Sequence, residues 1–166
     1  MHKKKNEPHA LTCDWKTGAT QNAGTKSEDK IYRHKGSCRW SSVKTERYKQ
    51  KDGGWSDISR HVLIGNRGES TKFHLRYFEI ATGGFSSLEK HRHEHVVICV
   101  KGKGKVVIGN KSYSIGSLDT VYIAPDTVHQ LSNPYKEPFG FFCIVNAKRD
   151  KPKLVRRGKE SKSKAG

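Results

Sequence analysis

The sequence lacks the features of a membrane protein or a secreted protein. None of its 166 residues fall in a run approaching the roughly 18–20 apolar residues that a bilayer-spanning helix needs. The first five residues, Met-His-Lys-Lys-Lys, are basic, but no apolar stretch follows them as in a secretory signal. We therefore expect a cytoplasmic protein with no membrane partner, of a length that suits one domain with a modest core.

Paired cysteine motifs are also absent. The four cysteines, Cys13, Cys38, Cys99 and Cys143, form no Cys-x-x-Cys pair, which argues against a zinc ribbon or a thioredoxin-like motif. Cys99 and Cys143 lie in apolar runs and are expected in the core. Cys13 and Cys38 lie in polar surroundings and are expected to be free thiols in a reducing compartment.

Acidic side chains are scarce, with 16 Asp and Glu against 33 Lys and Arg, for a net charge of +17. Residues 1–50 carry 12 basic and 5 acidic side chains, residues 148–166 carry 9 and 2, and residues 51–147 carry 12 and 9. Basic ends can bind nucleic acid by neutralising phosphates. Because no aromatic residues alternate with the lysines in a stacking pattern, solvated tails are favoured over a nucleic-acid partner.

The chain divides into three parts by composition. Residues 1–40 show no hydrophobic period and are rich in Lys, Thr, Ser, Gly and Asn, which predicts a disordered basic N-terminal segment. Residues 41–147 contain the apolar runs of a folded domain. Residues 148–166 are predicted to be an unstructured basic C-terminal tail.

Short apolar runs separated by turn residues predict an all-β domain. Gly109-Asn110 is typical of a hairpin turn, and Gly83-Gly84 is expected to end a strand. No long amphipathic helix intervenes and no internal repeat occurs. Turn signals every 8–12 residues favour an antiparallel sandwich or a closed barrel. Strands are expected at 61–64, 73–80, 96–100, 105–108, 111–115, 120–124 and 140–145.

Histidines and carboxylates are concentrated near residue 90. The cluster, with one further histidine at the end of a later strand, consists of Glu89, His91, His93, Glu94, His95 and His129. Imidazole and carboxylate are ligands of borderline divalent metals. Three histidines at spacing two with a fourth after a proline turn favour a metal site over a solvated polar strand with freely titrating histidines.

The geometry of a strand limits which of these residues can share one ion. At about 3.3 Å per residue, a straight strand places Glu89 and His95 about 20 Å apart. A single ion therefore requires the chain to turn near Arg92-His93, so that His95 folds back towards His91. A neighbouring strand would then supply His129 from the other side.

The spacing of these residues resembles the first motif of the cupin superfamily, which reads Gly, five residues, His-x-His, three or four residues, Glu, six residues, Gly. Here Gly83 is followed by five residues and Glu89, then by His91, His95 and Gly102, with no gap. Glu89 stands where the motif has its first His, and His95 stands where it has Glu.

The second cupin motif, Gly-Asp, an apolar strand and Pro-x-Gly-x-x-His-x-x-x-Asn, is matched from Gly116 to Asn133. Ala124 replaces the motif's Pro and Asp126 its Gly, whereas His129 and Asn133 fall on the motif's own positions. The resemblance covers residues 70–147. It implies a double-stranded β-helix, or jelly-roll barrel, with a metal in its mouth.

The resemblance also implies a ligand set. In the gapless register it is Glu89, His91, His95 and His129. In a second register His91 and His93 are the His-x-His pair, so His93 is a possible substitute. Such a histidine-rich set suits Fe(II), Mn(II), Ni(II), Zn(II) or Cu(II).

Two functions follow from this resemblance. One is a metal-dependent enzyme acting on a small molecule, of the dioxygenase, isomerase, decarboxylase or lyase type, in which Glu94 or His93 is the candidate general acid or base. The other is a non-catalytic ligand-binding or sensor module whose basic tails dock on an acidic partner. Cupin barrels also often pair through edge strands, so a homodimer is expected.

Side chains of the neighbouring strands are candidates for the metal pocket. If His95 faces inward, then Val97 and Cys99 share its face. A thiol-linked role is the third functional hypothesis, with Cys99 or Cys143 near the metal. Depending on strand phase, the same cavity is expected to contain some of Tyr77, Tyr113, Tyr122, Phe141 and Cys143.

Overall fold

The computed structural model describes residues 27–48 and 55–155. These residues form strands and no helix, and every pairing between strands is antiparallel. The strands are β1 (Glu46–Arg47), β2 (Ser56–Ile64), β3 (Phe73–Phe85), β4 (Glu89–Lys90), β5 (His95–Lys101), β6 (Gly104–Ile108), β7 (Lys111–Ile115), β8 (Thr120–Ile123), β9 (His129–Ser132), β10 (Phe139–Asn146) and β11 (Lys153–Leu154).

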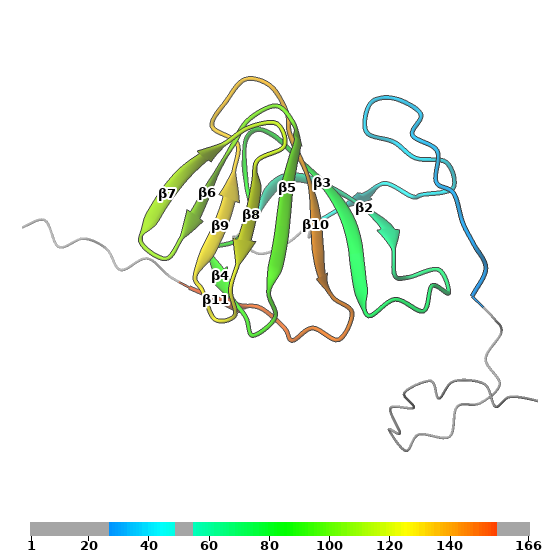
Figure 1. The fold of residues 1–166 in the computed structure, drawn as a ribbon. Coiled ribbons are helices and arrows are strands. Elements are labelled where there is room, and N and C mark those ends of the chain that lie inside the picture. The colour runs from blue at the N-terminus through cyan, green and yellow to red at the C-terminus, as the bar shows by residue number, and fades with distance from the viewer. Residues whose placement is uncertain (1–26, 49–54, 156–166) are drawn as a thin grey trace, which may run out of the picture.

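The strands curl into a barrel with two walls (Figure 1). One wall has the order β1-β2-β3-β10-β5-β8, and the other has the order β7-β6-β9-β4-β11. The end of β3 joins the two walls, because Phe85 pairs with Ser132 of β9. The barrel predicted from the sequence is confirmed.

The glycine pair at 83–84 lies inside β3, so the prediction that it ends a strand is wrong. β3 runs from Phe73 to Phe85, and Gly83 has a φ of +76°, a conformation that favours glycine. A Cβ on Gly84 would lie 2.8 Å from the Ser56 carbonyl oxygen. Glycines here let the strand bend from one wall to the other while its backbone keeps pairing.

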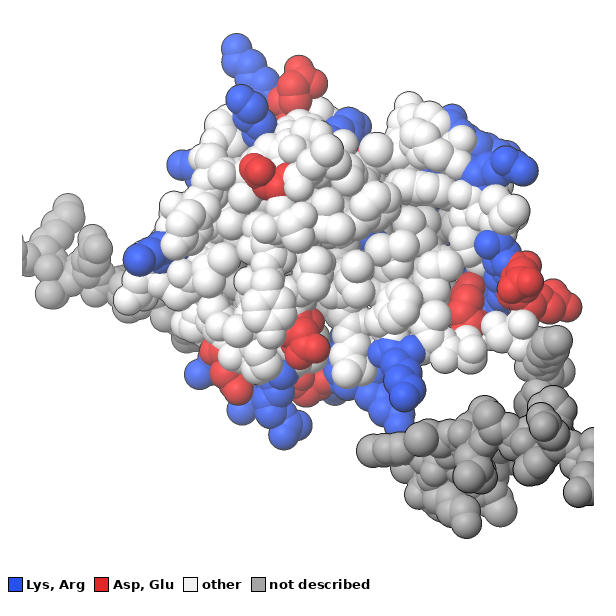
Figure 2. Space-filling model, viewed as in Figure 1, with Lys and Arg blue, Asp and Glu red and all other residues white. Residues whose placement is uncertain are grey.

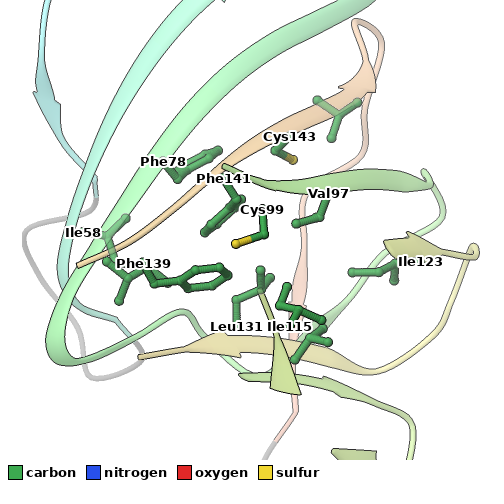
Figure 3. Close-up of a cluster of buried hydrophobic side chains, with 13 residues drawn as sticks. Ile58, Phe78, Val97, Cys99, Ile115, Ile123, Leu131, Phe139, Phe141 and Cys143 are labelled. Carbon is green, nitrogen blue, oxygen red and sulfur yellow. The ribbon is translucent and has the colours of Figure 1, made fainter. Parts of the chain in front are cut away.

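The core lies between the two walls, where alternate residues of each strand face inward. Val97, Cys99, Ile123 and Phe139 are fully buried, as is Ile80 of β3. Figure 3 shows labelled side chains of β3, β5, β9 and β10 pointing towards one another in this core. Both Cys99 and Cys143 belong to it, as expected from their apolar surroundings.

Residues of the second motif hold the barrel ends in place. The buried Asn133 amide donates to the carbonyls of Ile80 and Glu137, both at 2.9 Å, and so ties β3 to the turn after β9. Asp126, which replaces the motif's glycine, has a φ of +59°, and Asp tolerates this left-handed conformation better than most residues. Its backbone N–H donates to the His91 carbonyl at 2.7 Å, so this turn braces the histidine loop.

Residues 27–40 do not follow the prediction of a disordered segment, whereas residues 1–26 lie outside the described residues. The Trp40 ring packs against Tyr77 and Phe142, with centroid distances of 5.1 and 6.1 Å. Tyr32 donates a hydrogen bond to Glu69 at 2.9 Å. A few aromatic anchors in a polar sequence are enough to dock it on the barrel, although they produce no hydrophobic period.

Residues 148–155 also depart from the prediction of an unstructured tail, and residues 156–166 lie outside the described part. β11 pairs with β4, where Leu154 is opposite Glu89, and the Val155 N–H donates to the Leu88 carbonyl. This segment therefore passes directly beside the histidine loop.

The described residues contain no helix long and apolar enough to cross a membrane. In Figure 2 charged side chains lie mainly along the edges of the displayed face, and its middle is largely free of them.

Candidate metal centre

Three buried histidines converge at one end of the barrel. His91 follows β4, His95 begins β5 and His129 begins β9. Each offers a ring nitrogen, and these three atoms all lie within 4.8 Å of one another. The chain makes the turn at 91–94 that a single site requires, because β4 ends at Lys90 and β5 begins at His95.

The ring orientations fit a metal ion. The Nδ1–H of His91 donates to the His93 carbonyl at 2.7 Å, and that of His129 donates to the Thr127 carbonyl at 2.9 Å. Such bonds fix the tautomer that presents Nε2 as a ligand. Moreover, the buried Nε2 atoms of His91 and His95 have no hydrogen-bond partner. Buried polar atoms are rarely left unpaired, and an ion shared by these nitrogens would give both of them a partner.

Burial keeps the three imidazoles neutral, as metal ligation demands. It lowers the pKa of His91 and of His129 below the ordinary value. For His95 burial, reinforced by the neighbouring His129 and His91, lowers the pKa to about 2.

Glu89 lies beside the three histidines and outside their cluster. Its carboxylate is buried, lines the same cavity and accepts a hydrogen bond from the Ser87 hydroxyl. Its backbone is in register with His129 on the neighbouring strand. The gapless motif register includes Glu89 among the ligands, but the converging atoms come from histidines alone.

His93 is held by the C-terminal segment. Its ring stacks on His91 with centroids 3.6 Å apart, and its Nδ1 lies 2.8 Å from the Asp150 carboxylate. Asp150 also accepts the backbone N–H groups of Arg92 and His93, and these bonds hold its pKa below its usual range. His93 is therefore adjacent to the converging nitrogens without being one of them. Sequence reasoning missed Asp150 because it lies in a basic, turn-rich tail without a motif.

Glu94, expected as an acid or base, is exposed and does not line the cavity. The turn between β4 and β5 explains this, because its residues 91 and 93 are buried whereas residues 92 and 94 are exposed.

The three histidines open into a cavity of about 120 Å³. One water needs roughly 10–15 Å³, so the cavity has room for a small molecule. Apolar walls come from Tyr48, Trp55, Phe78, Val97 and Phe141, and further polar lining residues include Arg76, Cys143, Arg149 and Asp150.

Among the candidates for this cavity, Phe141 and Cys143 line it and the three tyrosines do not. Tyr113 and Tyr122 are exposed, at 46% and 61%. Tyr122 lies on the outward phase of β8, next to the buried Ile123, whereas Tyr113 has the same phase as the buried Ile115 but lies on the edge strand β7, which among the described strands pairs only with β6. Tyr77 is buried on the opposite face of β3, under Trp40. Cys99 shares the inward face of His95, as expected, but lies in the core and not on the cavity wall.

Cys143 links the histidines to a buried arginine. Its sulfur lies 3.7 Å from Nδ1 of His95 and accepts a hydrogen bond from Nη2 of Arg76 at 3.3 Å. Burial raises the pKa of the Cys143 thiol, whereas the neighbouring Arg76 guanidinium acts in the opposite direction. The thiol-linked hypothesis therefore stays a prediction, with Cys143 and not Cys99 beside the histidines.

Comparison with known proteins identifies relatives of this barrel. Residues 76–145 match the model of the cupin domain family. Over 117 residues the chain is 38% identical to 1-methylthio-D-xylulose 5-phosphate methylsulfurylase of Rhodospirillum rubrum, covering 70% of this chain and 74% of that protein.

Solved structures agree. A cupin-2 domain protein from Rhodospirillum rubrum is 37% identical, with a TM-score of 0.66 over 71% of this chain and 78% of the other. A cupin-2 conserved barrel protein from Rhodopseudomonas palustris is 34% identical, with a TM-score of 0.71 over 76% and 87%. With the barrel, both motifs and these relatives in agreement, this chain belongs to the cupin superfamily.

Proposed function

We propose that this protein is a metal-dependent enzyme that acts on a small phosphorylated ketose carrying a thioether. The observation that carries the proposal is the convergence of His91, His95 and His129 on one wall of a cavity lined by both apolar and charged side chains. The substrate class is taken from the name of the relative that is 38% identical over most of both chains.

The ketone and the methylthio group of such a substrate each have a matching feature in the cavity. The three histidines would hold a divalent ion, of Fe, Mn, Ni, Zn or Cu, and leave positions open to the substrate. A bound ion would polarise the ketone oxygen. The apolar walls formed by Phe78 and Phe141 suit a methylthio group, because thioether sulfur packs favourably against aromatic rings.

Two groups beside the histidines can hold the protons that reactions next to a ketone require. Glu89 presents a buried carboxylate to the cavity, and the Ser87 hydroxyl fixes its orientation. It is the candidate base for a proton on a carbon next to the ketone. His93, oriented by Asp150, is the candidate acid.

The experiment is to purify the protein, measure its metal content and follow 1-methylthio-D-xylulose 5-phosphate by NMR. Turnover is expected in the metal-loaded protein, with loss of both metal and turnover in His91→Ala and His129→Ala. His34→Ala is the matched control, because His34 is exposed and lies outside the cavity lining. Full metal retention in both site variants, or no turnover by the loaded wild type, would overturn the proposal.

A further inference from the structure

Arg76 is a buried cation without a carboxylate partner. It lies on the inward face of β3, is 5% exposed and lines the cavity. Its Nη2 contacts the Cys143 sulfur, its Cζ lies 5.1 Å over the Phe78 ring, and its buried Nε has no hydrogen-bond partner. Among the described residues, no ion pair includes Arg76. A buried charge is costly unless an opposite charge accompanies it.

Arg149 brings a second guanidinium to the mouth of the same cavity. Its Nη1 lies 3.2 Å from Nδ1 of His74 and 3.5 Å from the Asn146 carbonyl oxygen. Arg149 and Arg76 line the same cavity, and partial burial together with the nearby Arg76 charge lowers the pKa of Arg149. Among the residues that the structure describes, Arg149 forms no ion pair either.

The acidic residues of the cavity do not neutralise this pair. Asp150 is engaged by His93 and by two backbone N–H groups of the histidine loop. Glu89 is engaged by Ser87. Neither carboxylate lies within 4.0 Å of a guanidinium of the pair.

We propose that Arg76 and Arg149 form a binding site for a phosphate monoester. The Cys143 thiol lies between Arg76 of this site and His95 of the metal centre. Two positive charges match a phosphate dianion, and guanidinium groups donate paired hydrogen bonds to phosphate oxygens. The unpartnered Nε–H of Arg76 would then donate a hydrogen bond to one of these phosphate oxygens. The assignment of this phosphate to the substrate rests on the proposed function, but the anion site itself does not.

The test measures binding of inorganic phosphate and of D-xylulose 5-phosphate to the full-length protein by calorimetry. Arg76→Gln and Arg149→Gln are each expected to weaken both ligands by at least about tenfold, the value of one charged hydrogen bond. Arg47→Gln, which removes an exposed charge elsewhere, is the control and is expected to change neither by more than about twofold. If Arg76→Gln loses the wild-type circular dichroism spectrum, Arg149→Gln decides the outcome, because Arg149 is exposed at the cavity mouth.

A His129→Ala variant separates this site from phosphate bound directly to a metal. The proposal expects His129→Ala to keep inorganic phosphate affinity within about threefold while both arginine variants lose it. The proposal is overturned if the wild type binds neither ligand, or if His129→Ala abolishes binding while the arginine variants match the wild type. The proposed function is tested by the metal content and turnover of the wild type, and the arginine site by phosphate binding. Each proposal can therefore be refuted without refuting the other.

Discussion

Replacing His91 and His93 in turn should separate a ligand from its neighbour. His91→Ala removes one of the three converging nitrogens, whereas His93→Ala removes a ring that stacks on it at 3.6 Å. The two variants lose the same side chain from adjacent inward positions of one loop, so each is the matched control of the other.

The expected magnitudes differ by about tenfold or more. Four-ligand structural zinc sites bind with about 10–16 kcal/mol, or about 3 kcal/mol per ligand, so His91→Ala should weaken metal binding by about two orders of magnitude. The carbonyl that orients His91 is the backbone of residue 93 and survives in His93→Ala. His93→Ala should therefore weaken binding by less than about tenfold.

The assay is competition of each purified variant with a chromophoric chelator, using Zn²⁺ and Mn²⁺ separately. Bound metal after dialysis gives an independent measure. Equal losses in the two variants would make His93 a ligand and refute the reasoning, as would a His91→Ala protein that binds metal like the wild type.

Three further predictions follow from the same structure. In the metal-free folded protein, burial lowers the pKa values of His91, His95 and His129. As pH falls below about 6.5 these histidines therefore take up protons in the unfolded chain before they do so in the folded one, which lowers the free energy of unfolding. The melting temperature should therefore fall between about pH 7.5 and 5.5, less steeply in His95→Gln, and a constant melting temperature would contradict this. Asp150→Asn should lower turnover at least about tenfold with metal content unchanged, because it frees His93; wild-type turnover would argue against a role for this pair. Trp40→Ala should cost about 2 kcal/mol in urea unfolding, and an unchanged midpoint would show that the N-terminal segment adds no stability.

The sequence predicted those parts of the protein that depend on local pattern. Alternating apolar residues and turn glycines mark strands, because side-chain direction and turn geometry depend on a few neighbouring residues. Motif spacing also pointed to His91, His95 and His129, since the loops between them have lengths that a cupin barrel imposes.

Strand phase and long-range pairing were decided only by the tertiary structure. Glu89 lines the cavity outside the histidine cluster, and Tyr122 faces solvent, because the pairing of β4 with β9 and of β5 with β8 sets where each side chain points. Asp150 and Trp40 come from polar segments with no periodic signal, and each is fixed by a few contacts to residues distant in sequence. Likewise, nothing local distinguishes Arg76 from the other arginines. Its burial beside Cys143 arises from the pairing of β3 with β10.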